Sequence, residues 1–157
     1  MSSLLLHQSK GVNVKESEIA EKIRDGWIRL KVVIEVAGFP EDHIVKTINA
    51  MSEKLDKEKG MIVLEQAGHQ PTKVANKMYS AFMEMEFLSE SLVQLVGILY
   101  DYMPSSVEII EPEDPISDDP QAITMILNDL LARLHRYNQV IHALKAENTI
   151  LKKQLKK

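Results

Sequence analysis

A repeat of apolar residues near the C-terminus constrains this chain more than any other feature of its sequence. From Leu127 onward, the repeat positions are separated alternately by three and four residues. This spacing averages about 3.5 residues and keeps one side of an α-helix facing a partner helix, as in a coiled coil. The positions of this seam are Leu127, Leu130, Leu134, Tyr137, Ile141, Leu144, Asn148, Leu151 and Leu155.

One polar residue, Asn148, interrupts the seam. It falls at an a position of the heptad, where a single buried asparagine sets register and oligomer state at some cost in stability. Leu144 and Leu151 fall at d positions, and leucine at d favours a parallel two-stranded coil. The seam therefore predicts that the chain binds itself, as a homodimer or as a higher oligomer.

The first half of the same helix has a wider apolar stripe than a two-stranded coil needs. Ile123, Ile126, Leu131 and Val140 lie beside the seam. This width favours packing on a globular domain or formation of a larger bundle. A second interpretation of the whole segment is one amphipathic helix folded back on its own domain. The polar seam residue and the lysine-rich end argue against that interpretation.

Composition and charge exclude several classes of protein. With no cysteine among 157 residues, the chain has no disulfide framework and no cysteine-based zinc site, which fits a cytoplasmic location. No apolar run approaches the roughly 18 residues of a membrane span. Residues 121–157 contain seven Lys/Arg against two Asp/Glu, a net charge of +5, whereas the whole chain carries −4. This basic C-terminal end is a candidate contact for a partner protein.

Hydrophobic periodicity predicts an α+β domain over residues 14–112. It follows a segment, 1–13, that we expect to be disordered, and an acidic linker, 113–119, joins it to a coiled-coil helix over 120–157. The predicted elements of the domain are a short helix capped by Asn13, a strand at 27–36, a helix at 40–59, a strand at 61–66, a strand at 78–88, a helix at 92–103 and a strand at 107–111.

Residues 72–103 allow two interpretations, because their apolar residues fit both a helical and an alternating spacing. A capping box formed by Ser91 and Gln94 favours a strand followed by a new helix. The resulting order is β-α-β-β-α-β, a ferredoxin-like plan in which the first and third strands are neighbours. On their polar face, Arg29 and Lys31 would then lie beside Glu84 and Glu86.

The turn at Gly38, Phe39 and Pro40 is the candidate ligand site of the domain. It leads into a helix N-terminus, whose free N–H groups can bind an anion, and His43 follows in the first turn. In strand order, residues 27–112 resemble the ACT-like regulatory domains. That resemblance implies a ligand, such as an amino acid, bound at this turn in a subunit interface.

Motifs for catalysis, metal ions and nucleic acid do not occur in the chain. It contains no phosphate-binding glycine loop, nucleophile elbow or zinc-protease helix, and its five histidines lack the spacing of a metal pair. A DNA-binding zipper needs a basic segment before the coil, and this one is acidic. An RNA-recognition sheet needs aromatic residues where Glu84 and Glu86 stand. We therefore expect no cofactor and no nucleic-acid partner.

The sequence predicts a non-enzymatic assembly or adaptor protein, dimerised by a parallel coiled coil. Two alternatives stay open. One is a ligand-sensing dimer of the ACT-like kind, and the other is an enzyme whose site forms between subunits.

Overall fold

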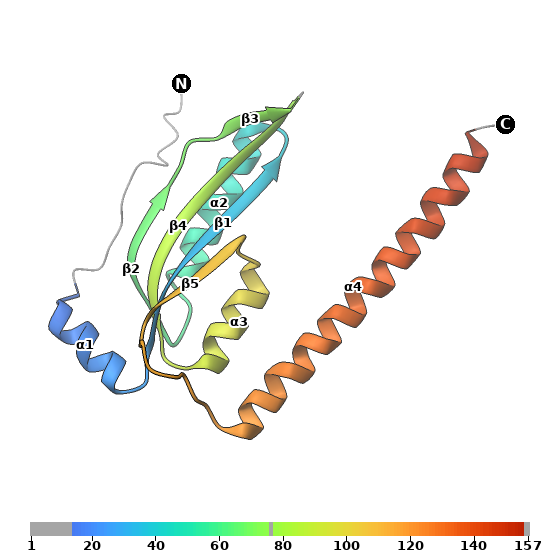
Figure 1. The fold of residues 1–157 in the computed structure, drawn as a ribbon. Helices are drawn as coiled ribbons and strands as arrows, with labels where there is room; N and C mark the ends of the chain where they lie inside the picture. The colour runs from blue at the N-terminus through green and yellow to red at the C-terminus, as the bar shows by residue number, and fades with distance from the viewer. Residues whose placement is uncertain (1–13, 76, 156–157) are drawn as a thin grey trace. The chain divides into compact units, whose positions relative to one another are not determined.

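The computed structural model describes residues 14–75 and 77–155, which form two compact units. The first, called here the sheet unit, reaches to Asp118 and is of mixed α+β class. The second begins at Asp119 and contains one long helix, α4 (Pro120–Gln154) (Figure 1). The predicted disordered segment 1–13 lies outside the described residues.

The sheet unit contains an antiparallel sheet of five strands and three further helices within its described residues. Its elements, in chain order, are α1 (Glu16–Arg24), β1 (Ile28–Gly38), α2 (Glu41–Leu55), β2 (Met61–Gly68), β3 (Thr72–Ala75), β4 (Met78–Ser89), α3 (Leu92–Tyr102) and β5 (Ser106–Glu111).

The strand order is β2-β4-β1-β5, and the short β3 pairs with β4. The longest ladder joins β1 to β4, from the pair Ile28 and Ser89 to the pair Gly38 and Tyr79. The strand and helix predicted at 78–88 and 92–103 are thus confirmed, and the helical interpretation of the strand is wrong.

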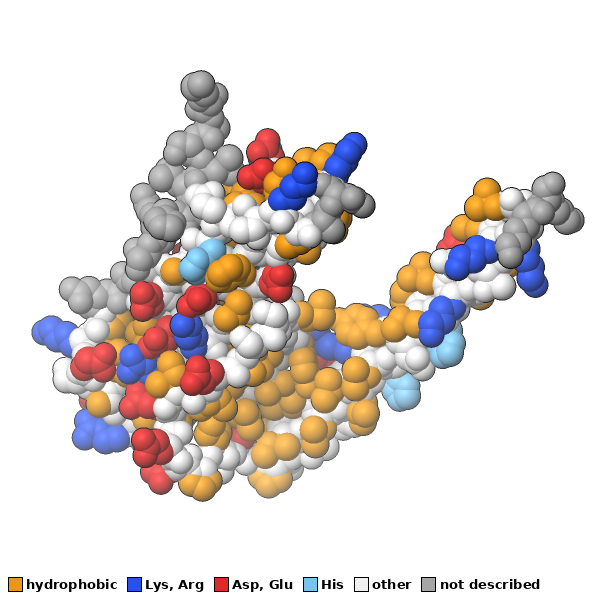
Figure 2. All heavy atoms as spheres, turned by 45° about the horizontal axis from the view of Figure 1, so that its top comes forward, with side chains coloured by type: hydrophobic (Ala, Val, Ile, Leu, Met, Phe, Trp, Pro, Cys, Tyr) orange, Lys and Arg blue, Asp and Glu red, His pale blue; other side chains and the backbone are white. Residues whose placement is uncertain are grey.

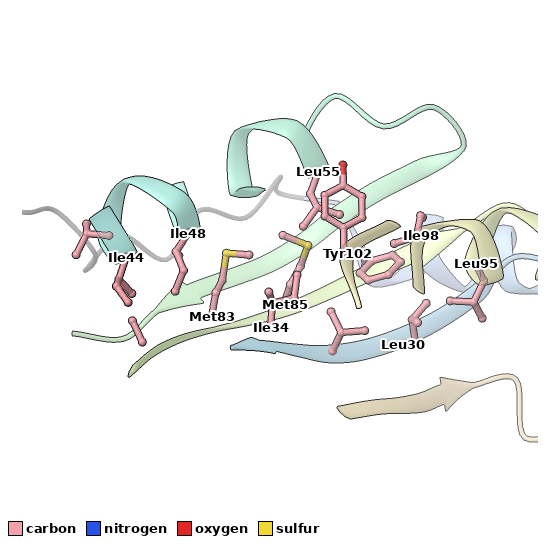
Figure 3. Close-up of a cluster of buried hydrophobic side chains, with 14 of the residues drawn as sticks. Leu30, Ile34, Ile44, Ile48, Leu55, Met83, Met85, Leu95, Ile98 and Tyr102 are labelled. Carbon is pink, nitrogen blue, oxygen red and sulfur yellow. The ribbon is translucent and has the colours of Figure 1, made fainter. Parts of the chain in front are cut away.

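The core lies between one face of the sheet and the helices α2 and α3 (Figure 3). Alternation along β1 places Ile28, Leu30, Val32 and Ile34 on that face, and each is almost fully buried. A fully buried aliphatic side chain stabilises the fold by about 1.5–3 kcal/mol. From α2, Ile44, Ile48 and Leu55 point into this layer, and from α3, Leu95, Ile98 and Tyr102 do so.

The predicted capping box at the start of α3 is half formed. The backbone N–H of Gln94 donates to Ser91 Oγ at 3.2 Å, as an N-cap requires. The Gln94 side chain donates instead to the carbonyl oxygen of Lys59 at 2.6 Å. Ser91 therefore caps the helix, whereas Gln94 ties α3 to the turn before β2.

Two predicted helix boundaries are wrong, and one strand was missed. α1 begins at Glu16 with Lys15 as its N-cap, two residues later than predicted, and the predicted cap Asn13 lies outside the described residues. α2 ends at Leu55 rather than near Lys59, because Leu55 is its last buried residue. The strand β3 was not predicted.

β3 forms because β4 is longer than its neighbour on that side. β2 pairs with β4 only from Met83 to Ser89, which leaves the first residues of β4 with free backbone groups. Thr72 and Lys73 pair there with Ser80 and Tyr79. A four-residue strand at the tip of a long one has little sequence signal of its own.

Candidate functional site

The long helix α4 carries the residues that the sequence predicts to be functional. Its start matches the predicted one: Asp119 is the N-cap, Pro120 is the first helical residue, and the backbone N–H of Ala122 donates to Asp119 Oδ2 at 3.1 Å. The proline ring fixes a helical φ where no N–H is needed. The carboxylate accepts one of the free N–H groups of the first turn.

No residue of α4 between Pro120 and Gln154 is buried in the described chain. Most seam leucines are half exposed or more, at 54% for Leu127, 52% for Leu134, 58% for Leu144 and 50% for Leu151, whereas Leu130 is partly covered. Hydrophobic side chains follow the helix along its length in Figure 2, and Lys/Arg side chains gather toward its C-terminal end. α4 thus presents an apolar stripe along its length, of the kind that coiled-coil helices carry.

Asn148 lies on the same face of α4 as Ile141 and Leu144. Ile141 and Leu144 are three residues apart, and Leu144 and Asn148 are four apart, along a continuous helix. It is exposed, like its neighbours. Thr149, next to it, donates its hydroxyl to the Lys145 carbonyl oxygen at 2.9 Å. The helix therefore presents one amide in an otherwise apolar row.

The residues that widen the apolar stripe beyond the seam differ in how exposed they are. Leu131 and Val140 are about half exposed, at 53% and 51%. Ile123 and Ile126 are partly covered. Arg133 pairs with Asp129 one turn earlier at 2.8 Å, and this pair lies on the exposed surface of the helix. The apolar surface beside the seam is thus partly covered near the start of α4 and half exposed at Leu131 and Val140.

The predicted ligand turn lies at the end of β1. Gly38 is the last residue of β1, Pro40 is the N-cap of α2, and Phe39 is 58% exposed. A Cβ on Gly38 would lie 3.4 Å from Ile44 Cδ1, which is ordinary contact. The fold brings Phe39 and His43 to the same end of α2, and the His43 side chain is exposed.

The charges around this turn are acidic. Glu41 and Asp42 occupy the first turn of α2 and already complement the positive end of its dipole. An anionic ligand there would meet two carboxylates. The geometry favours a neutral or cationic group beside Phe39 over a phosphate.

A charged network covers the outer face of the sheet, the face opposite α2 and α3. Arg29 is its centre: its guanidinium lies 2.6 Å from Glu86 on β4, 3.2 Å from Glu111 on β5 and 3.6 Å from Glu16 on α1. Burial works to lower the pKa of Arg29, but hydrogen bonds to Glu86 and Glu111 outweigh it and raise this pKa. One side chain thus joins four elements.

A second group on the same face contains an aromatic pair. Lys31 Nζ lies 2.6 Å from Glu84 Oε2, and His69 Nε2 lies 3.7 Å from Glu84 Oε1. The His69 ring stacks on Phe82 with centroids 4.0 Å apart. The hydrogen bond and charge of Lys31, with a smaller effect of His69, hold the pKa of Glu84 below its usual range. The hydrogen bond to Glu84 likewise raises the pKa of Lys31.

The predicted pairing of Arg29 and Lys31 with Glu84 and Glu86 is therefore confirmed. Acidic and basic side chains are interspersed over this part of the molecule (Figure 2). Each of these carboxylates is paired with an adjacent cation across neighbouring strands.

Several effects raise the pKa of Tyr102. The largest is burial of its side chain, and the next is the hydrogen bond to Glu58. Its hydroxyl donates to Glu58 Oε1 at 2.5 Å. The phenol stays neutral at physiological pH and links α3 to the turn after α2. It is a packing residue with a polar tip.

Sequence reasoning missed several members of the charged network. Glu16, Glu111 and His69 lie 13, 82 and 40 positions from Arg29 in the numbering, on a helix, an edge strand and a loop. No local periodicity connects them to it. Among the residues that the structure describes, no group of three His, Cys, Asp or Glu is placed to hold a metal ion.

Comparison with known proteins identifies a family. The model of the MJ0538 family matches residues 29–154, which is most of the chain. The chain belongs to the MJ0538 family. No curated protein and no solved structure matches it.

The MJ0538 family match begins in β1 and ends at the last residue of α4. It takes in the sheet unit from Arg29 onward and the long helix together. The helix is thus part of the pattern that defines the MJ0538 family, and the sheet is too. Within the described residues, no helix combines the length and apolarity needed to cross a bilayer.

Proposed function

We propose that this protein is a non-enzymatic homo-oligomeric assembly or adaptor protein, dimerised through α4 by a parallel coiled coil. One observation carries the proposal: α4 is 35 residues long, and none of its apolar seam residues is buried. Isolated helices are marginal in water, and most of their stability in proteins comes from packing of an apolar face. A second α4 supplies that packing.

The details of the seam support two strands in parallel. Leucine at the d positions favours a dimer, and Asn148 at an a position can pair with Asn148 of the second copy only when the helices are in register. Glu147 at g and Lys152 at the following e are placed to pair between chains. Such exposed pairs contribute at most about 1 kcal/mol and select orientation more than they add strength.

We further propose that the sheet unit follows a ferredoxin-like plan. The order β2-β4-β1-β5 supports this, because the split β-α-β arrangement needs a later strand between the first two. The alternative function, an ACT-like ligand-sensing dimer, is favoured by the exposed Phe39 next to the start of α2. Its ligand would stabilise the native protein and raise its melting temperature.

Two further proposals concern where the protein works and what else it binds. The absence of cysteine supports a reducing compartment such as the cytoplasm. The lysines at 145, 152 and 153 support a contact between the end of α4 and an acidic protein surface.

Sedimentation of the full chain with two seam substitutions tests the dimer. Leu144→Asp combined with Leu151→Asp places four carboxylates in the apolar contact of a dimer, which we expect to dissociate it. The matched control, Ala143→Asp with Ala146→Asp, puts the same charges at outer positions of the same helix, beside Leu144. The control should sediment as wild type. A wild-type chain that sediments as a monomer at micromolar concentration contradicts the proposal.

A further inference from the structure

The edge strand β5 is unusually exposed for a strand of its composition. Within the described sheet, β5 pairs with β1 on one side, and its other side forms the edge (Figure 1). Val107 is 48% exposed, Ile109 47% and Ile110 37%. Val107 and Ile109 face the core side of the sheet opposite Val32 and Leu30, which are buried. The core layer thus ends before it covers β5.

Natural edge strands normally carry features that prevent pairing with another chain. Lysine, proline and inward-pointing charges are the usual ones, because a row of free N–H and C=O groups otherwise binds any extended strand. The six residues of β5, Ser-Val-Glu-Ile-Ile-Glu, include no lysine and no proline. Glu111 is held by Arg29 at 3.2 Å, and Lys31 lies near Glu108. The acidic residues of the strand are thus compensated within the same chain.

The chain just before β5 is apolar as well. Met103, three residues before the start of the strand, is 65% exposed. A partner that paired with β5 would therefore meet apolar side chains beside the edge. A suitable partner therefore has both free backbone groups along a strand edge and exposed apolar side chains. A second copy of β5 has both, because it is the same strand.

We propose that β5 pairs antiparallel with β5 of a second copy, so that the two sheets of a dimer become one continuous sheet. The inference rests on the proposed coiled coil for its affinity. β5 is joined to α4 by the eight residues 112–119. A parallel coil therefore tethers both strands at an effective concentration of about a millimolar. A contact too weak to assemble free sheet units becomes populated under these conditions.

Charge selects the register of the pair. Two registers overlap most of the strand, one centred on Glu108 and one on Ile109. The first places two glutamates directly opposite one another, which destabilises a strand pair. The second places Ile109 opposite Ile109 and Glu108 opposite Ile110. We therefore assign the register centred on Ile109.

Disulfide cross-linking of the full chain tests this register. The chain has no cysteine, so a single introduced thiol reports one contact. Opposed residues of an antiparallel pair have Cα atoms about 4.5–5.5 Å apart, within the range of a disulfide. We expect Ile109→Cys to form covalent dimers on mild oxidation. The matched control is Val74→Cys on β3, a valine that is 58% exposed near the opposite edge of the sheet. We expect it to cross-link at least about tenfold less.

A second cysteine variant separates this inference from the proposed function. Leu155→Cys lies on the seam and cross-links only in a parallel coil in register. Its control is Lys153→Cys at an outer position. Cross-linking of Leu155→Cys without Ile109→Cys overturns the β5 pairing and leaves the coiled coil standing. Cross-linking of Ile109→Cys without Leu155→Cys supports the pairing and contradicts the parallel coil. Failure of both, with the Trp27 fluorescence of the folded chain retained, overturns both.

Discussion

At the scale of single residues, Arg29 does the most to hold the elements of the sheet unit together. Its side chain is 20% exposed and reaches carboxylates on α1, β4 and β5. Charge-assisted hydrogen bonds of this kind are stronger than those between neutral groups. A planar guanidinium has five N–H donors in fixed directions, so it can hydrogen-bond several carboxylates at once. A lysine ammonium has three donors on a flexible stem and fixes the geometry of its partners less.

We expect Arg29→Met to destabilise the protein by about 1–2 kcal/mol, because it leaves Glu86 partly buried without a cation while keeping the aliphatic stem. Urea unfolding monitored by Trp27 fluorescence measures the change. Arg24→Met on the exposed end of α1 is the control, and its effect should stay within about 0.5 kcal/mol. An equal effect of the two substitutions would contradict the role of Arg29.

Glu84 gives the protein a predictable dependence on pH. Its pKa is lower in the folded chain than in the unfolded one, because Lys31 and His69 favour the carboxylate. The stabilisation that the ionised Glu84 contributes is therefore complete above the ordinary pKa of glutamate, about 4.3. It is lost as pH falls through the lower pKa that Glu84 has in the folded chain. Glu84→Gln should lose less stability between neutral and acid pH than wild type.

Urea midpoints measured at several pH values check this prediction. Glu53→Gln, on the exposed surface of α2, is the matched control and should follow the wild-type curve. A Glu84→Gln variant with the same acid sensitivity as wild type would show that the pair with Lys31 does not survive in solution.

At the scale of elements, α4 differs from every other helix of the chain. α1, α2 and α3 each bury at least one residue against the sheet unit, whereas the described residues of α4 bury none. Its sequence nevertheless continues as a helix for 35 residues. The proposed coiled coil would account for this length, since a coiled coil repeats its contacts every heptad.

Replacement of the polar seam residue tests the register of this element. Asn148→Leu should raise the melting temperature of α4 and broaden the set of oligomers, because leucine removes a buried amide that only a matched partner satisfies. Circular dichroism and sedimentation measure the two effects. Asn128→Leu, at an outer position, is the control. Unchanged melting and unchanged assembly of Asn148→Leu would place this residue off the seam.

At the scale of the whole molecule, the two units should unfold separately. Trp27 is the single tryptophan of the chain and lies in the sheet unit, under the ammonium of Lys22 at 4.1 Å. Its fluorescence reports that unit alone. The ellipticity at 222 nm includes α4, whose stability in a dimer depends on protein concentration.

We expect the ellipticity transition to move to higher temperature when the protein concentration is raised tenfold, while the Trp27 transition moves less. The reason is mass action on a dimeric helix joined to a unit with its own core. The double Asp variant at Leu144 and Leu151 should lose this dependence. Transitions that coincide at every concentration would mean that the units unfold as one.

The sequence by itself determined the elements whose signals are local and periodic. Alternation identified β1, the heptads identified α4, and Asp119 with Pro120 located its start. The pairing of Arg29 and Lys31 with Glu86 and Glu84 also followed, once the strand order was assumed. These features depend on side-chain spacing within a segment, which a sequence states directly.

Only the tertiary structure decided which segments lie side by side where no periodic sequence pattern connects them. β3 exists because β4 extends beyond β2, and His69 stacks on Phe82 because the chain stays paired with β4 just after β2 ends. Glu16 and Glu111 reach Arg29 from elements on opposite sides of it in the chain. The exposed edge of β5 likewise follows from how far α2 and α3 cover the sheet, a property of packing and not of any one segment.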